Sequence, residues 1–254
     1  MLDAKKKAQL SPMNDVVFRE LFGDVRSKEI TKEMIEDVIG EKISIIELDK
    51  NANLFGKRAS DKIGIIDVRA EINGKQQVDI ELQRAKQESF AERILFYWAR
   101  LYERQIQRGK NYDVLERSII IAFVDYETEI LQGLPADTKW QVIESKHGKK
   151  VLTNRLEVHI ISIPKIKESV DNESIIKWVE FLENPYREEI TKMTENEEGI
   201  KKAVERLNEI NGDEETIREA ELREKYILDY NSAMSTAKHD GIKEGVTKRK
   251  SGRC

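Results

Sequence analysis

A stretch from Lys62 to Gln83 constrains the fold of this chain more than any other segment. Its two halves flank Asn73-Gly74, and in each half apolar residues alternate with polar ones. A period of two is the pattern of half-buried β-strands. The apolar positions are Ile66, Val68, Ala70 and Ile72 in the first half and Val78, Ile80 and Leu82 in the second. The sequence therefore predicts a hairpin with one apolar face and one face that carries several carboxylates.

The alternation also limits how the two strands pair. A two-residue Asn-Gly turn would set Asp67 opposite Ile80 and would mix the two faces. An odd-length connection keeps the faces separate. A three-residue loop over residues 73 to 75 sets Asp67 opposite Glu81, whereas a loop shifted by one residue, with a glycine bulge, sets it opposite Asp79. In either register the carboxylates remain within reach of a shared ion.

The composition is that of a folded protein outside the membrane. Of 254 residues 39% are apolar, which is enough for a core, and no apolar run approaches the ~20 residues of a spanning helix. Cys254 is the only cysteine, which excludes an internal disulfide and fits a reducing compartment. We therefore expect a cytoplasmic protein with no membrane partner. The 44 basic and 48 acidic residues give a net charge of -4, which neither requires nor excludes a nucleic-acid partner.

The sequence lacks the motifs of several other chemistries. His147, His159 and His239 are too far apart to form the close zinc-binding pair of one helix. The sequence contains no phosphate-binding glycine loop and no Gly-x-Ser-x-Gly elbow. These absences argue against a nucleotide cofactor, a nucleotide-dependent motor and a serine hydrolase.

Hydrophobic periodicity predicts an α/β arrangement around the hairpin. The predicted elements are a helix between Asn14 and Gly23, a helix between Ser27 and Gly40, a strand from Ile43 to Leu48, the hairpin, a helix from Glu88 to Arg108, buried strands at Ile119–Val124 and Leu156–Ile163, and a helix from Glu173 to Leu182. The polar segment from Thr128 to Lys150 is predicted to be a surface excursion.

The composition changes near Pro185, where sparse apolar positions and many charges begin to follow a helical spacing. We therefore expect a domain at residues 1–185 and a charged helical region at 186–240. The basic, glycine-containing segment 241–254 is expected to be disordered.

Several short motifs follow one another in a characteristic order along the chain. They are Ser11-Pro12, Asn14-Asp15, Phe18 to Gly23, Asp61-Lys62 before Asp67, Ile80 to Gln83, Arg93 with Tyr97 and Trp98, Leu156 to Pro164, and Trp178 with Phe181-Leu182. In this order the chain resembles the PD-(D/E)XK nucleases, and more closely the Rpn-type recombination-promoting nucleases, also described as PD-(D/E)XK family transposases. The resemblance covers roughly three-quarters of the sequence. It implies a restriction-endonuclease-like α/β core, with a small mixed sheet flanked by helices, followed by a charged helical appendage.

The resemblance also implies a DNA endonuclease that depends on Mg²⁺, or on another divalent cation such as Mn²⁺, and promotes recombination. Asp67 and Glu81 would be catalytic, metal-binding carboxylates, and the backbone carbonyl of Leu82 would be a further metal ligand. A hard cation prefers such oxygen ligands, and it would polarise the scissile phosphate and acidify a bound water for in-line attack.

Gln83 would occupy the catalytic position that lysine holds in the general pattern, although glutamine is common there in the Rpn-like subgroup. Lysine would supply positive charge near the attacking water, whereas glutamine is neutral and orients groups only by hydrogen bonds. Lys86, Arg84, Arg69 or a second ion could supply that charge, and the sequence does not choose among them.

Four basic residues are candidates for binding DNA. Arg93 opens the helix beside the proposed site and could contact phosphate, and Arg100 lies further along the same helix. Lys57 and Arg58 lie in the polar loop before the hairpin.

The aromatic residues Phe96 and Tyr97 are candidates for stacking on bases. The expected partner is DNA, and the sequence leaves a homo-oligomer open. Two alternatives remain at this stage: a nucleic-acid-binding module of the same fold without cleavage, and a protein-interaction component dominated by the C-terminal helices.

Overall fold

A six-stranded mixed sheet organises the structure, with the strand order β1-β2-β3-β4-β6-β5. The computed structural model describes residues 9–49, 67–86 and 89–251. Strands β3, β4 and β6 run parallel, and β1, β2 and β5 join them in antiparallel pairs. The strands are β1 (Ile46–Leu48), β2 (Asp67–Ile72), β3 (Gln76–Gln83), β4 (Ser118–Val124), β5 (Asp137–Trp140) and β6 (Leu156–Ser162).

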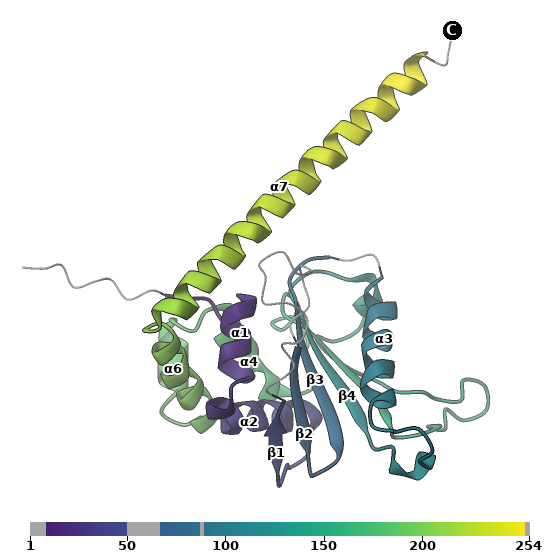
Figure 1. Cartoon of the computed structure of the whole chain (residues 1–254), viewed down its shortest axis with the longest axis vertical. Coiled ribbons are helices and arrows are strands. Elements are labelled where there is room, and N and C mark those ends of the chain that lie inside the picture. Colours follow the sequence, from purple (N-terminus) through teal and green to yellow (C-terminus); the bar gives the residue numbers. More distant parts are fainter. Residues whose placement is uncertain (1–8, 50–66, 87–88, 252–254) are drawn as a thin grey trace, which may run out of the picture.

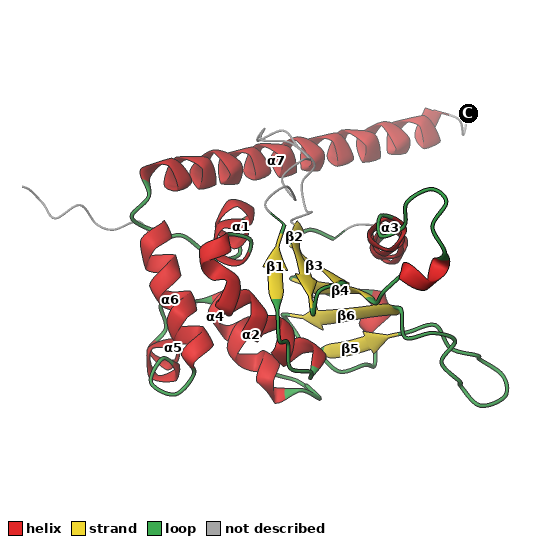
Figure 2. Cartoon of the chain, turned by 60° about the horizontal axis from the view of Figure 1, so that its bottom comes forward, coloured by secondary structure: helices red, strands yellow, loops and turns green. Residues whose placement is uncertain are grey.

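Helices cover both faces of this sheet (Figures 1 and 2). On one side lie α1 (Asp15–Phe22), α2 (Lys28–Ile39), α4 (Ile176–Glu183), α5 (Glu188–Met193) and α6 (Glu198–Ile210), and on the other lies α3 (Phe90–Glu103). The long helix α7 (Glu214–Ser251) begins against α1 and then leaves the rest of the fold. Short 3-10 turns occur at Val25–Ser27, Tyr112–Val114, Glu129–Leu131 and Glu173–Ile175.

The hairpin of β2 and β3 adopts the first of the two predicted registers. Asp67 pairs with Glu81, and residues 73–75 form a three-residue loop. Asn73 and Gly74 have φ angles of 52° and 79°. Asparagine and glycine are the residues that tolerate this left-handed conformation best. The odd-length connection is thereby confirmed, and it keeps the apolar and polar faces of the hairpin apart.

Strand β4 explains how the sheet supports two cores. Alternate residues Ile119, Ile121 and Phe123 join the larger core with α1, α2 and α4, while Ile120, Ala122 and Val124 join a smaller core under α3. All six side chains are fully buried. A strand covered on both faces reads as a continuous apolar run, so the prediction for Ile119–Val124 is confirmed.

Helix α3 ends earlier than its periodicity predicted. It stops at Glu103 with Arg104 as its C-cap, rather than near Arg108. The side-chain amide of Gln105 donates to the Glu116 carbonyl at 3.2 Å and accepts from the Glu116 N–H at 2.7 Å. These bonds tie the chain to the start of β4, and this tertiary contact replaces further helical turns.

Strand β5 lies inside the segment predicted to be a surface excursion. Its four residues pair antiparallel with β6 at the edge of the sheet. The sequence Asp137–Trp140 is short and carries two charges. It therefore lacks the apolar run or regular alternation by which a strand is recognised, and its conformation comes from pairing with β6.

The C-terminal third is more integrated and more helical than its composition suggested. Ile190, Ile200, Leu207 and Ala220 lie in the same core as α1 and α2, although they follow the predicted boundary near Pro185. Whether residues 1–185 fold without them stays a prediction.

Helix α7 continues to Ser251 through the segment predicted to be disordered from residue 241. Gly241 and Gly245 each weaken a helix by about 1 kcal/mol relative to alanine, but propagating an existing helix is much easier than starting one. No helix in the described ranges combines the length and the apolar character needed to cross a bilayer.

Leu207→Ala tests whether the C-terminal helices belong to the main folding unit. Leu207 is 1% exposed in the shared core, so the change should lower the free energy of unfolding by about 2–5 kcal/mol. Urea denaturation followed by circular dichroism measures this. Leu228→Ala is the matched control, because Leu228 is 64% exposed on α7 and should change stability by less than about 0.5 kcal/mol. A separate early transition for Leu207→Ala, with the main transition unchanged, would instead indicate an independent appendage.

Candidate active site

Three polar residues of β3 lie on the sheet face that α3 covers. The parallel register sets Asp79, Glu81 and Gln83 beside every second residue of β4, from Ile120 to Val124. Their exposed fractions are 1%, 0% and 1%. Burying carboxylates is costly unless they are paired, so these residues do not form an ordinary solvated strand face. The polar face of the hairpin is therefore an interior surface.

Glu81 and Gln83 form a buried hydrogen-bonded pair. The Gln83 amide Nε2 donates to Glu81 Oε2 at 2.8 Å. The Gln83 amide oxygen is buried and finds no hydrogen-bond partner in the part of the chain that the structure describes. Leaving a buried acceptor unsatisfied costs about 1–3 kcal/mol. Gln83 thus orients one carboxylate oxygen and presents a second polar atom that a bound water could satisfy.

Asp67 lies directly opposite Glu81 in the β2–β3 ladder. Opposite residues of an antiparallel ladder share one face of the sheet, with Cβ atoms about 5 Å apart. The side chain of Asp67 lies outside the described part of the structure, so the register places its backbone only. Leu82 sends its side chain into the larger core, while its backbone lies between Glu81 and Gln83.

The donor atoms of this face fit a hard divalent cation. Carboxylate, amide and carbonyl oxygens are the ligands such ions prefer, and Mg²⁺ takes few protein ligands because it retains waters and binds substrate phosphate. Among the described side chains, which do not include that of Asp67, no group of three or more His, Cys, Asp and Glu residues could hold a metal.

Arg69 lies at the other end of this polar face. The ladder pairs it with Asp79, and its Nε is 3.8 Å from Asp79 Oδ1. The ion pair is almost buried, with side-chain exposures of 16% and 2%. Arg69 was one candidate for the positive charge that Gln83 does not supply, and its charge is largely balanced by Asp79.

Arg93 and Tyr126 supply two further buried donors near the start of α3. Tyr126 follows β4 and packs edge-to-face on Phe90, the first residue of α3, with ring centroids 6.3 Å apart. Arg93 lies one helical turn further, with its guanidinium 5.8 Å from the centre of the Tyr97 ring. Arg93 Nη2 and the Tyr126 hydroxyl are buried, and neither has a hydrogen-bond partner among the described residues.

The pKa of Tyr126 connects these groups to Glu81. Burial raises the pKa of the phenol, the positive charge of Arg93 lowers it, and the negative charge of Glu81 raises it. The hydroxyl therefore lies in the electric field of both groups. Sequence reasoning missed Tyr126. Its position directly beyond the buried strand Ile119–Val124 was a usable signal, because functional side chains gather where parallel strands end.

The model of the PD-(D/E)XK nuclease family transposases matches residues 12–237. The chain belongs to this family. No curated protein and no solved structure matches it. Membership confirms the predicted family and the restriction-endonuclease-like fold. It also makes the protein a member of a nuclease family that acts on DNA and generally uses divalent metal ions.

Other residues predicted for the PD-(D/E)XK site are more dispersed. Arg84 and Lys86 follow β3 and are exposed. Arg100 lies further along α3, with its guanidinium 5.8 Å from the centre of the Phe96 ring. Lys57 and Arg58 lie outside the described residues, and their contribution to DNA binding stays a prediction.

The opposite face of the sheet carries a second polar cluster, centred on Glu157 in β6. This buried carboxylate is contacted by Arg117 at 2.5 Å, His159 at 2.7 Å and Lys139 at 3.0 Å. Burial raises the pKa of Glu157, but hydrogen bonds from His159, Arg117 and Lys139 outweigh it and lower the pKa to about 2.

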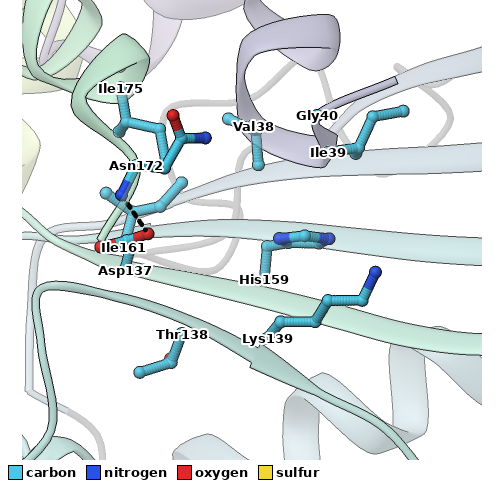
Figure 3. Close-up of a pocket in the computed structure, with 10 residues that line it drawn as sticks. All are labelled: Val38, Ile39, Gly40, Asp137, Thr138, Lys139, His159, Ile161, Asn172 and Ile175. Atoms are coloured by element: carbon cyan, nitrogen blue, oxygen red, sulfur yellow. Dashed lines mark hydrogen bonds between the residues drawn. The ribbon is translucent and has the colours of Figure 1, made fainter. Parts of the chain in front are cut away.

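A pocket of about 180 Å³ lies beside this cluster, and Lys139 and His159 are among its lining residues (Figure 3). Its lining also includes Asp137, which accepts a hydrogen bond from the backbone N–H of Asn172 at 3.1 Å. The Lys139 and His159 side chains at this pocket are already engaged with Glu157, which explains the cluster as a structural network of the fold.

Tyr126→Phe tests whether the Tyr126 hydroxyl is held for a ligand rather than for the fold. The hydroxyl has no partner among the described residues, so its removal should leave the free energy of unfolding unchanged or raise it by up to about 1 kcal/mol. Thr31→Val is the control, because the buried Thr31 hydroxyl donates to the Phe22 carbonyl at 2.6 Å and its loss should destabilise by about 1–2 kcal/mol. Urea denaturation compares both variants. Destabilisation of Tyr126→Phe equal to that of Thr31→Val would assign the phenol to the fold.

Proposed function

We propose that this protein is a metal-dependent DNA endonuclease that hydrolyses phosphodiester bonds and promotes DNA recombination. The observation that carries the proposal is the buried, hydrogen-bonded pair of Glu81 and Gln83, which lies across the ladder from Asp67. Family membership supports the nuclease activity, and the family's description as transposases supports a role in recombination.

Asp67, Glu81 and the backbone carbonyl of Leu82 would hold the ion, Mg²⁺ or another divalent cation such as Mn²⁺. When bound there, such an ion polarises a phosphate and lowers the pKa of a coordinated water. Gln83 orients Glu81 through its amide N–H, and its amide oxygen is available to accept a hydrogen bond from the attacking water.

Arg93 is our choice for the positive charge that lysine supplies in the general pattern. Arg93 lies one turn after Phe90, which packs on Tyr126, and its positive charge lowers the pKa of that phenol while the charge of Glu81 raises it. A buried guanidinium nitrogen with no described partner is suited to a phosphate oxygen, because charge-assisted hydrogen bonds of arginine to phosphate are strong. Tyr126 would donate a second hydrogen bond to the same phosphate.

Asp67→Ala and Glu81→Gln test the catalytic assignment. Each variant should cleave plasmid DNA with added Mg²⁺ roughly 100-fold more slowly, or not at all, since each removes a charge that acts at the reacting phosphate. Conversion of supercoiled to nicked and linear plasmid measures the rate. Glu71→Gln is the matched control, because Glu71 lies on β2 at the end of the hairpin away from Asp67 and Glu81. Its carboxylate accepts a hydrogen bond from the Gln77 side chain at 3.0 Å. Equal activity of all variants, or an inactive wild type under varied salt and metal, would remove the enzyme hypothesis.

Thermal unfolding separately tests metal binding. Mg²⁺ that binds only the folded chain should stabilise the wild type by about 2.7 kcal/mol at a concentration 100-fold above its Kd. Asp67→Ala should lose most of this stabilisation. Differential scanning fluorimetry in EDTA and in MgCl₂, with NaCl at matched ionic strength, measures the shift. A Tm rise of the same size in Asp67→Ala would place the ion elsewhere.

The leading alternative is a nucleic-acid-binding module of this fold that does not cleave. The observation that favours it is Gln83, a neutral residue where the general pattern has lysine. This alternative predicts an inactive wild type that nevertheless binds DNA with a steep salt dependence. A protein-interaction role carried by the C-terminal helices predicts no DNA binding even at low salt.

A further inference from the structure

Helix α3 exposes more apolar surface than its packing requires. It buries Phe90, Ile94 and Leu101 against β4 and β6. Leu95 and Phe96 lie on its outer side, with exposed fractions of 53% and 57%. A single exposed apolar residue is ordinary on a protein surface. Exposure alone therefore does not indicate a function for Phe96, and the side chains around it are the relevant observation.

Two rings stand between two guanidinium groups along this helix, with Tyr97 partly buried against the smaller core and Phe96 exposed. The Arg93 guanidinium lies 5.8 Å from the centre of the Tyr97 ring, and the Arg100 guanidinium lies 5.8 Å from the centre of the Phe96 ring. The two rings meet edge-on, with centroids 5.8 Å apart. We call Arg93, Tyr97, Phe96 and Arg100 the arginine–aromatic row. These cation–π contacts keep the rings oriented while one ring remains largely in solvent.

The row begins at the candidate active site. Arg93 is its first member and lies one turn after Phe90, whose ring packs edge-to-face on Tyr126 at 6.3 Å. The residue before Tyr126, Asp125, donates its backbone N–H to the Gln83 carbonyl at 2.9 Å, which places the start of α3 beside the end of β3. From Arg93 to Arg100 the helix rises about 10 Å. At 3.4 Å per stacked nucleotide, that distance corresponds to two or three bases. A DNA strand that leaves the carboxylates along α3 would therefore pass over Tyr97 and Phe96.

We propose that the arginine–aromatic row binds unpaired bases next to the scissile phosphate, so that the preferred substrate is single-stranded or locally melted DNA. Bases within a duplex are stacked on one another and do not present their faces to a protein side chain. Every free base does present such a face, so aromatic stacking binds single strands without reading their sequence. This inference names the substrate class for the proposed nuclease and rests on that function.

Charge favours DNA over a second copy of the chain on this surface. The helix also carries Glu92 and Glu103, but with its C-cap Arg104 it remains net positive. A two-fold dimer would bring two such surfaces together, and like charges across an interface are unfavourable. A phosphate backbone has the opposite charge, and arginine contacts it readily.

Fluorescence anisotropy of the full-length chain in EDTA tests the proposal without cleavage. The probes are a labelled mixed-sequence single strand, the corresponding duplex, and a strand of the same length without bases. The wild type should bind the single strand more tightly than either of the other probes. Phe96→Ala should weaken single-strand binding about tenfold, since stacking of one base contributes roughly that factor, and should leave duplex binding nearly unchanged.

Two variants at adjacent positions control for lost apolar surface and for folding. Leu95→Ala removes a neighbouring side chain of similar exposure that has no ring, and it should leave single-strand binding within about twofold. Phe96→Tyr retains the ring and should bind like the wild type. The proposal would be overturned if Phe96→Ala and Leu95→Ala weakened single-strand binding equally. It would also be overturned if the wild-type protein bound the strand without bases as tightly as the strand with bases.

The outcomes separate this inference from the proposed nuclease function. A chain that cleaves DNA but shows no single-strand preference in EDTA refutes the inference alone. Base-dependent binding without cleavage in the presence of any metal supports the row as a base-binding surface and contradicts the proposed nuclease function. Absence of DNA binding refutes the row as a base-binding surface. The same conclusion follows if light scattering shows a dimer that Phe96→Ala converts to a monomer without a change in DNA preference.

Discussion

The pairing of β2 with β3 is the constraint on which the candidate site depends. A slip of one residue would move every polar side chain of β2 to the opposite face of the sheet, because the side chains of a strand alternate. The three-residue loop with Asn73 and Gly74 in left-handed conformations prevents that slip and sets Asp67 opposite Glu81. Strand β3 then also pairs with β4, so the acidic face meets α3 rather than solvent. Turn geometry at one end of the hairpin thus determines which groups meet at the other end.

Three buried polar residues in a central strand lower the stability of the fold. The larger core on the other face of the sheet compensates for this loss. The larger core receives the apolar face of β3 and draws on six helices from both ends of the chain. Its helices are also linked by ion pairs: Lys177 on α4 contacts Asp37 of α2 at 3.0 Å and Glu197, next to α6, at 2.7 Å. The smaller core can therefore remain partly polar, because stability is supplied on the other side of the sheet.

The sequence was most informative where a single period governs a segment. Alternation predicted the hairpin register, and the continuous run Ile119–Val124 predicted a doubly covered strand, because both signals depend only on which faces are buried. Prediction failed where distant contacts decide: β5 exists because β6 is beside it, and α3 ends where Gln105 bonds to Glu116. Tyr126 was missed although its place just beyond β4 was a usable signal, and its contact with Phe90 at the start of α3 is a tertiary contact that the sequence does not show.

The replacement of lysine by glutamine changes the electrostatics of the site rather than simply weakening it. A lysine at position 83 would lie on the same strand and face as Glu81, and a buried pair of opposite charges two residues apart would be partly self-neutralised. Gln83 instead leaves the carboxylate charge of Glu81 intact and uses its amide to fix one oxygen. The face consequently holds more negative charge, and in our proposal the positive charge comes from Arg93 on a separate element, α3. Because Arg93 is also the first residue of the arginine–aromatic row, the proposed catalytic site and the proposed base-binding surface share one side chain.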